Sequence, residues 1–387
     1  MKKRVFTLLV TCGALLLSAA PDDAQIYRAT TRHVDFDGET LCYYNTTELF
    51  SLMDSLPKFL GKMLSALNEA PDKQKLVEDS VKLFVDGFNF KAVRAAAWSQ
   101  KEINPDLYIY KSSTCLGKSA QMPGLFSLAG INGNLSLQGA LAMLPADVIF
   151  AHQTQLQPGK FYAHLTDLAR NSKNPQIAGA ENLVNLMLNQ QKINLPALLN
   201  SASGLYTFII AGETPETFRF SLTIPDRHGI LAATIKKFLP PAPQTPGRSK
   251  LPIPPAKGFE FIQPEFVYLE KEVILVSNFD RCLGKIHRSS ELRADFLRLL
   301  PATGAGFTVL KFTPTALANL KKSYQNQPVI MELLNTLSPA SAAEVIRITP
   351  DGVQSIGVAD FSISAAYFKF SQKLSSVITS IQAAKNK

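Results

Sequence analysis

LPADVIFAHQTQLQP (residues 144–158) and LPATGAGFTVLKFTP (residues 300–314) share the pattern that decides the fold. In each stretch, Leu-Pro-Ala opens an apolar run that is typical of a strand, and a proline follows at the same offset. Proline suits the first turn of a helix, because its missing N–H would have no intrahelical partner there. Each stretch therefore predicts a strand, a short turn and a helix that begins at Pro158 or Pro314.

The segments that follow are also alike. A further helical pattern comes after each predicted helix, and then a hairpin, at 205–224 in the first case and 344–361 in the second. In 217–224 apolar and polar residues alternate, which indicates one buried and one exposed face. The turn of the second hairpin is Pro350-Asp351-Gly352. Asp226 is expected to cap a helix after the first hairpin. The chain thus contains two predicted units of strand, helices and hairpin.

The N-terminal third has the same order of elements without the same residues. A strand pattern covers 41–44, helical patterns cover 48–67 and 76–85, with Pro57 interrupting the first, and a hairpin covers 90–110. This region is a candidate for a diverged third unit. We therefore predict an α+β fold of twisted antiparallel sheets covered by helices, in two or three related repeat units.

The predicted division of the chain is a signal peptide at 1–20 and three α+β units at 21–140, 141–298 and 299–387. Residues 239–257 contain seven prolines, and such a stretch is extended and unsuited to a helix or a central strand. It is either a linker between domains or a long loop. We favour the loop, because strand patterns resume after it at 258–262 and 266–276.

A repeated Leu-Pro-Ala-Asp strand start, followed by a helix and a hairpin, resembles a loose group of uncharacterised bacterial exported proteins. The resemblance covers roughly residues 140–361, and the second copy has Thr303 where the pattern has Asp. The domains of that group have no assigned function. The resemblance therefore implies a fold and an exported protein, and it implies no catalytic or binding residue.

The first 20 residues have the pattern of a secretory signal peptide. A basic start, Lys2 to Arg4, precedes a short apolar run and a small-residue end at Ala19 and Ala20, after which cleavage is expected. The run is too short to span a bilayer, which needs ~20 apolar residues. A lipoprotein signal at Cys12 is disfavoured, because Thr11 does not suit the small position before the cysteine. We expect an exported, periplasmic or extracellular protein with no transmembrane segment in the mature chain.

Charge and composition exclude some partners. Removing Lys2, Lys3 and Arg4 lowers the formal charge from +9 to +6, and the remaining basic residues are scattered. No dense Lys/Arg block alternates with aromatic residues, so we expect no nucleic-acid partner. Weak attraction to an anionic envelope polymer or lipid surface stays open. Trp98 is the only tryptophan, which argues against a sugar-binding groove lined by aromatic rings.

The mature chain keeps three cysteines, Cys42, Cys115 and Cys282. An oxidising compartment permits disulfides. Cys42 and Cys115 both lie in strand-like segments of the N-terminal third, so we predict a disulfide between them. The alternative is three thiols that act as small apolar side chains. No C-x-x-C sequence supports a redox centre or a zinc ribbon.

Motifs for catalysis are missing from the sequence. Ser55 and Lys58 fit the S-x-x-K pattern of serine β-lactamases, but the Lys-Thr-Gly or Lys-Ser-Gly strand of those enzymes is absent and Pro57 would disturb the helix. No G-x-S-x-G, P-loop, G-x-G-x-x-G or H-E-x-x-H sequence occurs. We therefore predict no catalytic residue and no cofactor, and whether the protein is an enzyme stays open.

The best metal-like cluster is His33, Asp35 and Asp37, whose side chains would share one face of a strand. They would span about 13 Å at ~3.3 Å per residue, too far for one ion, so we expect an exposed polar strand face and no metal. Asp147 is interpreted as a turn or cap residue. The remaining histidines have no ligand spacing; they are His152, His164, His228 and His287.

Apolar residues at helical spacing in the first helix are consistent with a lipid cavity or, more commonly, with a core face. They are Leu49, Leu52, Leu56, Phe59 and Leu60. The function predicted first is a non-catalytic envelope protein that binds a hydrophobic ligand, a polymer or a protein partner. The alternatives are an exported hydrolase with a dispersed active site, since catalytic groups need not be close in sequence, and an assembly factor. An apolar ligand site would favour the first, and a buried Ser/His/Asp set or carboxylate pair the second.

Overall fold

The protein is described from a computed structural model. It describes residues 21–47, 52–67, 69–116, 124–129, 134–214, 217–239, 247–252, 263–277, 292–349 and 351–385. The predicted signal peptide, Cys282, His287 and most of the proline-rich stretch lie outside these residues.

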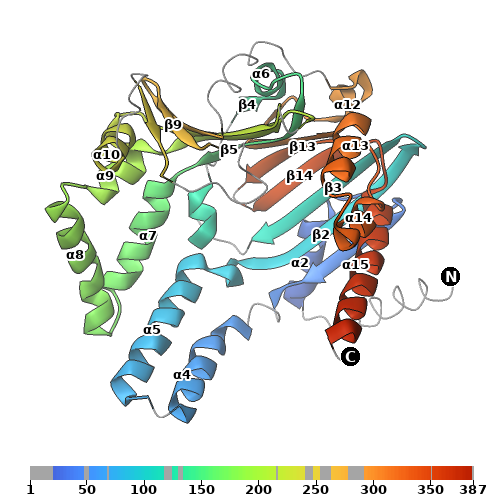
Figure 1. The fold of residues 1–387 in the computed structure, drawn as a ribbon. Helices are drawn as coiled ribbons and strands as arrows, with labels where there is room; N and C mark the ends of the chain where they lie inside the picture. The colour runs from blue at the N-terminus through green and yellow to red at the C-terminus, as the bar shows by residue number, and fades with distance from the viewer. Residues whose placement is uncertain are drawn as a thin grey trace.

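Twelve described strands form one antiparallel sheet in the order β1-β2-β3-β14-β13-β12-β5-β6-β7-β10-β9-β8 (Figure 1). The strands are β1 (Thr40–Asn45), β2 (Val93–Asn104), β3 (Leu107–Leu116), β5 (Val148–Leu156), β6 (Gly204–Ala211), β7 (Arg219–Pro225), β8 (Arg248–Lys250), β9 (Glu265–Tyr268), β10 (Glu272–Val276), β12 (Gly306–Phe312), β13 (Ala340–Thr349) and β14 (Gly352–Ala359). A separate two-stranded sheet pairs β4 (Leu135–Ser136) with β11 (Thr303–Gly304).

Helices lie on both sides of this sheet, and the α+β class predicted from the sequence is confirmed. The α-helices are α2 (Pro21–Thr31), α4 (Leu56–Ala66), α5 (Pro71–Phe88), α6 (Leu137–Ala142), α7 (Pro158–Arg170), α8 (Pro175–Gln190), α9 (Leu195–Ser201), α10 (Ile230–Phe238), α12 (Ala294–Leu299), α13 (Pro314–Ser323), α14 (Pro328–Leu334) and α15 (Ile363–Lys385). Short 3-10 helices are η2 (Leu52–Asp54), η3 (Phe90–Ala92) and η4 (Gly124–Leu128). Twelve of the described strands join into one continuous sheet to which all three predicted units contribute, and β4 and β11 form a second, small sheet.

The two Leu-Pro-Ala stretches form β5 and β12, which pair with each other at the centre of the sheet. Each strand also pairs with the first strand of its own hairpin, β5 with β6 and β12 with β13. Helices α7 and α13 begin at Pro158 and Pro314, as the sequence predicts. The order of elements is thus the same in both halves, and their equivalence as repeat units stays a prediction.

The N-terminal segment has a related layout. Strand β1 precedes α4 and α5, and it pairs with β2, the first strand of the hairpin β2–β3. The interruption expected at Pro57 lies just before it: η2 ends at Asp54 and α4 begins at Leu56, which places this proline in the first turn of α4.

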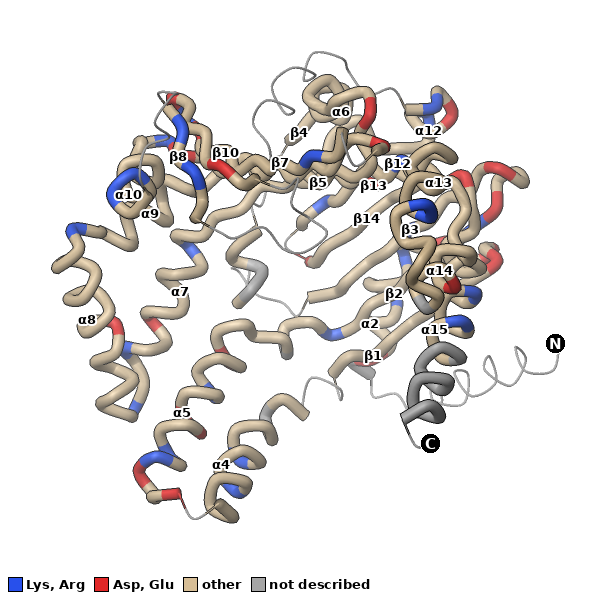
Figure 2. Tube along the Cα trace, viewed as in Figure 1, with Lys and Arg blue, Asp and Glu red and all other residues tan. Residues whose placement is uncertain are grey.

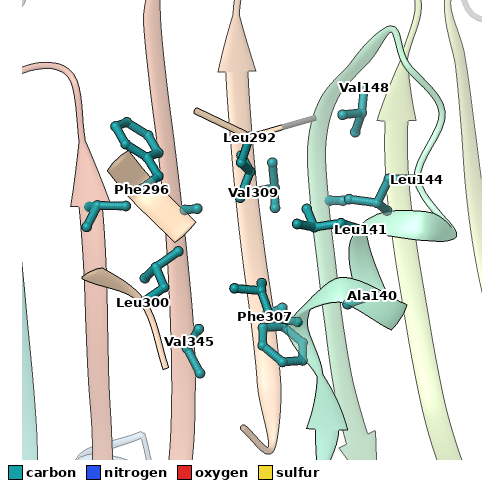
Figure 3. Close-up of a cluster of buried hydrophobic side chains, with 14 of the residues drawn as sticks. Ala140, Leu141, Leu144, Val148, Leu292, Phe296, Leu300, Phe307, Val309 and Val345 are labelled. Atoms are coloured by element: carbon teal, nitrogen blue, oxygen red, sulfur yellow. The ribbon is translucent and has the colours of Figure 1, made fainter. Parts of the chain in front are cut away.

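The main hydrophobic core lies where α6 and α12 pack on the central strands (Figure 3). Its strand residues include Ala151, Val309 and Ala343, which are paired across three neighbouring strands, and we call their side of the sheet the core face. Leu144 and Leu300, the first residues of the two shared stretches, are only 2% and 6% exposed and lie in this cluster. Their predicted burial is confirmed.

The proline-rich stretch contributes β8, which lies at one edge of the sheet. An edge strand tolerates nearby prolines, because one side of it needs no ladder hydrogen bonds. The predicted single run 266–276 is a hairpin of β9 and β10, closed by a hydrogen bond from Leu269 N–H to the Glu272 carbonyl (2.9 Å).

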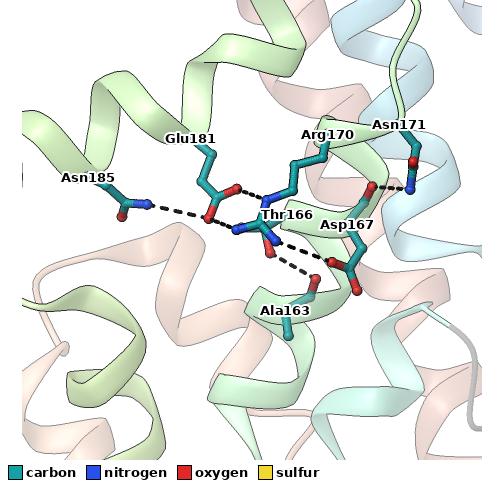
Figure 4. Close-up of polar contacts among 7 residues, drawn as sticks. All are labelled: Ala163, Thr166, Asp167, Arg170, Asn171, Glu181 and Asn185. Atoms are coloured by element: carbon teal, nitrogen blue, oxygen red, sulfur yellow. Dashed lines mark hydrogen bonds and ion pairs between the residues drawn. The ribbon is translucent and has the colours of Figure 1, made fainter.

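A charged pair joins α7 to α8 (Figure 4). The Arg170 guanidinium donates to both carboxylate oxygens of Glu181 at 2.6 and 2.8 Å, and Asn185 donates to the same carboxylate. The hydrogen bonds to Glu181 raise the pKa of Arg170, so the guanidinium stays charged. Since Glu181 is buried and is the only charged residue of α8, the rest of that helix is uncharged.

Charged residues of both signs are spread over many elements of the described chain (Figure 2). Within the described residues, no helix has the length and hydropathy needed to cross a membrane.

Candidate functional site

The side of the sheet opposite the core face, here the second face, carries a row of polar residues across its central strands. Its members are His152 on β5, Thr308 on β12, Glu344 on β13, Tyr110 on β3 and Gln100 on β2. We call this set the polar row. Successive members are direct cross-strand partners, with Gly357 of β14 between Glu344 and Tyr110. Strand alternation places all of them on one face.

Most of the polar row is half-buried, in contrast to the fully buried residues of the core face. Figure 1 shows α6 and α12 above the sheet, whereas on the other side α7 lies toward one end and α13 to α15 toward the other. The partial exposure of His152, Thr308, Glu344 and Tyr110 makes the polar row the candidate contact surface of the sheet.

His152 and Thr308 are in direct contact. The His152 Nδ1 and the Thr308 Oγ1 are 3.0 Å apart, so one of them donates to the other. Burial lowers the pKa of His152, and the negative charge of Glu344 only partly opposes this. The imidazole is therefore neutral at pH 7, and it can offer both a donor and an acceptor nitrogen.

Tyr110 lies over the backbone of Gly357. A Cβ at position 357 would overlap the Tyr110 ring, so glycine is the only residue that lets the ring lie there. The hydroxyl donates a long hydrogen bond to the Ala343 carbonyl (3.5 Å). Burial, and then the charge of Glu344, raises the pKa of Tyr110, which keeps the phenol protonated and able to donate.

Gln100 ends the row under the start of α15. Its amide donates to Ser362 (2.8 Å) and Ser364 (3.1 Å), and its carbonyl oxygen accepts from the Ser364 backbone N–H (3.1 Å). Gln100 is fully buried. Its hydrogen bonds are made within the protein, so the residues left for a ligand are His152, Thr308, Glu344 and Tyr110.

Apolar side chains flank the row. Phe150 and Leu310 are paired on one side, and the rings of Phe150 and Phe208 lie 6.2 Å apart beside His152. On the other side are Ile346 and, toward β2, the single tryptophan Trp98. A mostly apolar surface with a few polar groups is typical of small-molecule sites.

The row does not form a catalytic triad. A triad needs a third residue that orients the base from the side away from the nucleophile. Here Thr308 contacts His152, but Glu344 lies beyond Thr308, and the neighbour of His152 on its other side is Phe208. The geometry therefore gives no support to acyl transfer at this position.

The predicted metal-like residues lie in the turn between α2 and β1, and the expectation of a strand there is wrong. Each has a separate partner: His33 contacts Gln354 (2.7 Å), Asp35 pairs with Lys111 (2.7 Å) and Asp37 pairs with Lys101. Among the described residues, no group of three or more His, Cys, Asp or Glu side chains could hold a metal ion.

Two acids singled out by the sequence have structural partners. Asp147 forms a two-pronged ion pair with Arg219 (2.6 and 2.8 Å), which ties the start of β5 to β7. Asp226 accepts from Ser201 (2.5 Å) and from the backbone N–H groups of Leu231 and Ala232, so its predicted role at the start of α10 is confirmed.

The remaining residues that the sequence singled out do not come together as a functional site. Ser55 donates to the Leu52 carbonyl (2.6 Å) and is exposed, as is Lys58, so the S-x-x-K match forms no catalytic pair. His164 is in α7, and His228 is in the turn before α10. Phe59 of the predicted helical stripe is exposed, so this part of α4 is not a core face.

The predicted disulfide is not formed: Cys42 and Cys115 are both free thiols. Cys42 pairs with Trp98 of β2 and Cys115 pairs with Ala95, so β2 lies between them and they point to opposite faces. Two strand spacings are about 9.5 Å, beyond the ~4.4–6.8 Å between Cα atoms that a disulfide needs.

Sequence reasoning missed Thr308, Glu344 and Tyr110, and it treated His152 as a residue without ligand spacing. These four residues come from four strands that are far apart in the chain, and only the strand order and register bring them into one row. The available signal was weak: His152 and Glu344 are polar residues inside apolar strand patterns.

No protein-family model matches the chain, and neither a curated protein nor a solved structure is similar to it. The resemblance to exported bacterial proteins therefore stays a prediction.

Proposed function

We propose that this is an exported, non-catalytic protein that binds an amphiphilic small molecule on the second face of its sheet. The observation that carries the proposal is the polar row in the middle of a half-buried apolar surface. The apolar chain of the ligand would lie along Phe150, Leu310 and their neighbours, and its polar head would contact the row. Burial of apolar area supplies the affinity, at roughly 25 cal/mol per Å² removed from water.

Trp98 provides a direct test, because it is the only tryptophan and lies on the second face. Titration with dodecanol, an uncharged single-chain amphiphile, should change its emission in a saturable manner. Leu310→Thr should weaken binding at least several-fold, since it removes apolar surface, and the β-branched threonine suits the strand β12. Leu183→Thr is the control, because Leu183 is exposed on α8. No saturable binding, or equal binding by Leu310→Thr, would contradict the proposal.

Protein from the native host gives an independent test of the ligand. Native mass spectrometry of the purified protein should find a co-purified amphiphile, and the adduct should be lost in Leu310→Thr. A co-purified protein subunit in place of a small molecule would favour the assembly role.

Export is supported by the leader pattern at 1–20. N-terminal sequencing of the host protein should begin near Ala20 or Pro21. Soluble cytoplasmic protein that keeps Met1 would contradict export and leave the ligand-binding proposal standing.

A further inference from the structure

Glu344 differs from the other buried acids of the protein. It is half-buried on β13, and it makes no hydrogen bond or ion pair with any residue that the structure describes. The described acids that are fully buried have partners: Glu181 with Arg170, Asp226 with Ser201 and Glu265 with Arg248. Glu344 is the one acid on the six central strands β3, β14, β13, β12, β5 and β6. Partial removal of a carboxylate from water is unfavourable unless a partner compensates it.

The positions around Glu344 on the second face supply no positive charge. They are Thr308, Gly357, Ala342, Ile346, Leu310, Gly306, Ser355 and Ala359. Gly306, Ala342, Ser355, Gly357 and Ala359 are buried, and the partial exposure of Glu344 continues along Thr308, Leu310 and Ile346. The missing partner can therefore be supplied from outside the protein.

The two titratable neighbours in the row do not compensate the charge either. The negative charge of Glu344 acts to raise the pKa of both His152 and Tyr110. His152 nevertheless stays neutral at pH 7, and Tyr110 stays protonated. They can orient a head group by hydrogen bonds. The row therefore presents one negative charge flanked by neutral polar groups and aromatic rings.

We propose that the head group bound by the polar row is an alkylammonium, with the Glu344 carboxylate as its counter-ion. This inference rests on the proposed amphiphile-binding function. An ammonium donates three hydrogen bonds, which suits Glu344 together with a Thr308 or His152 acceptor. The neighbouring rings add cation–π attraction for such a group. Fatty amines and lipids with an ethanolamine head group share this chemistry.

The test compares dodecylamine, dodecanol and dodecanoate, which have the same chain length and differ in head-group charge. Calorimetry and Trp98 emission at pH 7, below micelle-forming concentrations, give the affinities. The wild type should bind dodecylamine about 10- to 100-fold more tightly than dodecanol, as expected for a hydrogen bond to a charged group, and should bind dodecanoate most weakly.

Glu344→Gln should abolish the preference for dodecylamine, so that dodecylamine and dodecanol bind the variant with similar affinity. Glu272→Gln is the matched control, because it removes a glutamate from β10 on the core-face side of the sheet. A lysophosphatidylethanolamine with a twelve-carbon chain forms the second arm, and tighter binding than dodecylamine would identify a lipid source.

Two failures can be told apart. If dodecylamine and dodecanol bind equally to the wild type, or if Glu344→Gln keeps the preference for the amine, the head-group inference is wrong and amphiphile binding stands. If none of the ligands binds, the proposed function itself fails.

Discussion

The two faces of the same central strands have different compositions and different burial. On the core face, Ala151, Val309, Ala343 and Val358 are all apolar and lie buried in the cluster with α6 and α12. On the second face, the adjacent positions are His152, Thr308, Glu344 and Gly357, and most of them are half-buried. A shift of one residue along a strand thus moves a position from the buried core to the face that we propose binds the ligand. The difference suggests that stability and binding can be changed separately.

The largest expected effect is on the free energy of unfolding, when two phenylalanines on central strands are each replaced by alanine. Phe307 of β12 lies on the core face and is 3% exposed, whereas Phe208 of β6 lies on the second face and is half-buried. Phe307→Ala should lower the free energy of unfolding by about 3–5 kcal/mol, since it removes a fully buried ring. Phe208→Ala should cost less than half as much and should weaken amphiphile binding. Urea denaturation measures the free energy of unfolding of both variants. Equal losses in the two variants would contradict the distinction between the faces.

The two Leu-Pro-Ala stretches give the next prediction. Leu144→Ala and Leu300→Ala should each destabilise the protein by about 2–5 kcal/mol, because both leucines lie in the central cluster. Leu183→Ala, at a position 60% exposed, should stay within about 0.5 kcal/mol of the wild type. If only one of the two buried leucines matters, the two stretches do not occupy equivalent places in the core.

Substitution of Gly357 tests the position of the Tyr110 ring on the second face. Gly357→Ala places a Cβ against the Tyr110 ring, and the overpacking should cost about 1–3 kcal/mol. Adding Tyr110→Ser should recover much of this stability, because it removes the ring that clashes. Gly179→Ala is the control: no atom lies near its added Cβ, and alanine should stabilise α8 by about 0.4–1 kcal/mol. Thermal denaturation of the four proteins decides whether the ring lies on Gly357.

The smallest effect is the pH dependence that His152 contributes. Its pKa in the folded protein is below the ordinary value of 6.5, so the unfolded chain takes up the proton first as the pH falls. The contribution of the neutral imidazole is complete above pH 6.5, and it decreases as the pH falls from 6.5 toward the lowered pKa. The stability difference between wild type and His152→Gln should change over that window only. A difference that is constant with pH would show that the histidine is not desolvated.

The sequence predicts local features well and the site poorly. Pro158 and Pro314 mark helix starts, Asp226 marks the first turn of α10, and the alternation after residue 217 marks a strand, since each of these signals acts within a few residues. The disulfide prediction failed because strand order is a non-local property: β2 pairs between β1 and β3. The polar row was missed for the same reason, since its register depends on pairings between distant segments.

The contact between His152 and Thr308 has a consequence for the symmetry of the molecule. Leu300 lies 156 positions after Leu144, and Thr308 lies 156 positions after His152. Two neighbouring antiparallel strands are related by a local two-fold axis, and with this offset the axis passes between His152 and Thr308. Two identical units would place identical side chains opposite each other at this point. A ligand could then bind equally well in either of two opposite orientations. Because one side has a histidine and the other a threonine, the two orientations are chemically different, and the apolar chain of a bound ligand should lie in one of them.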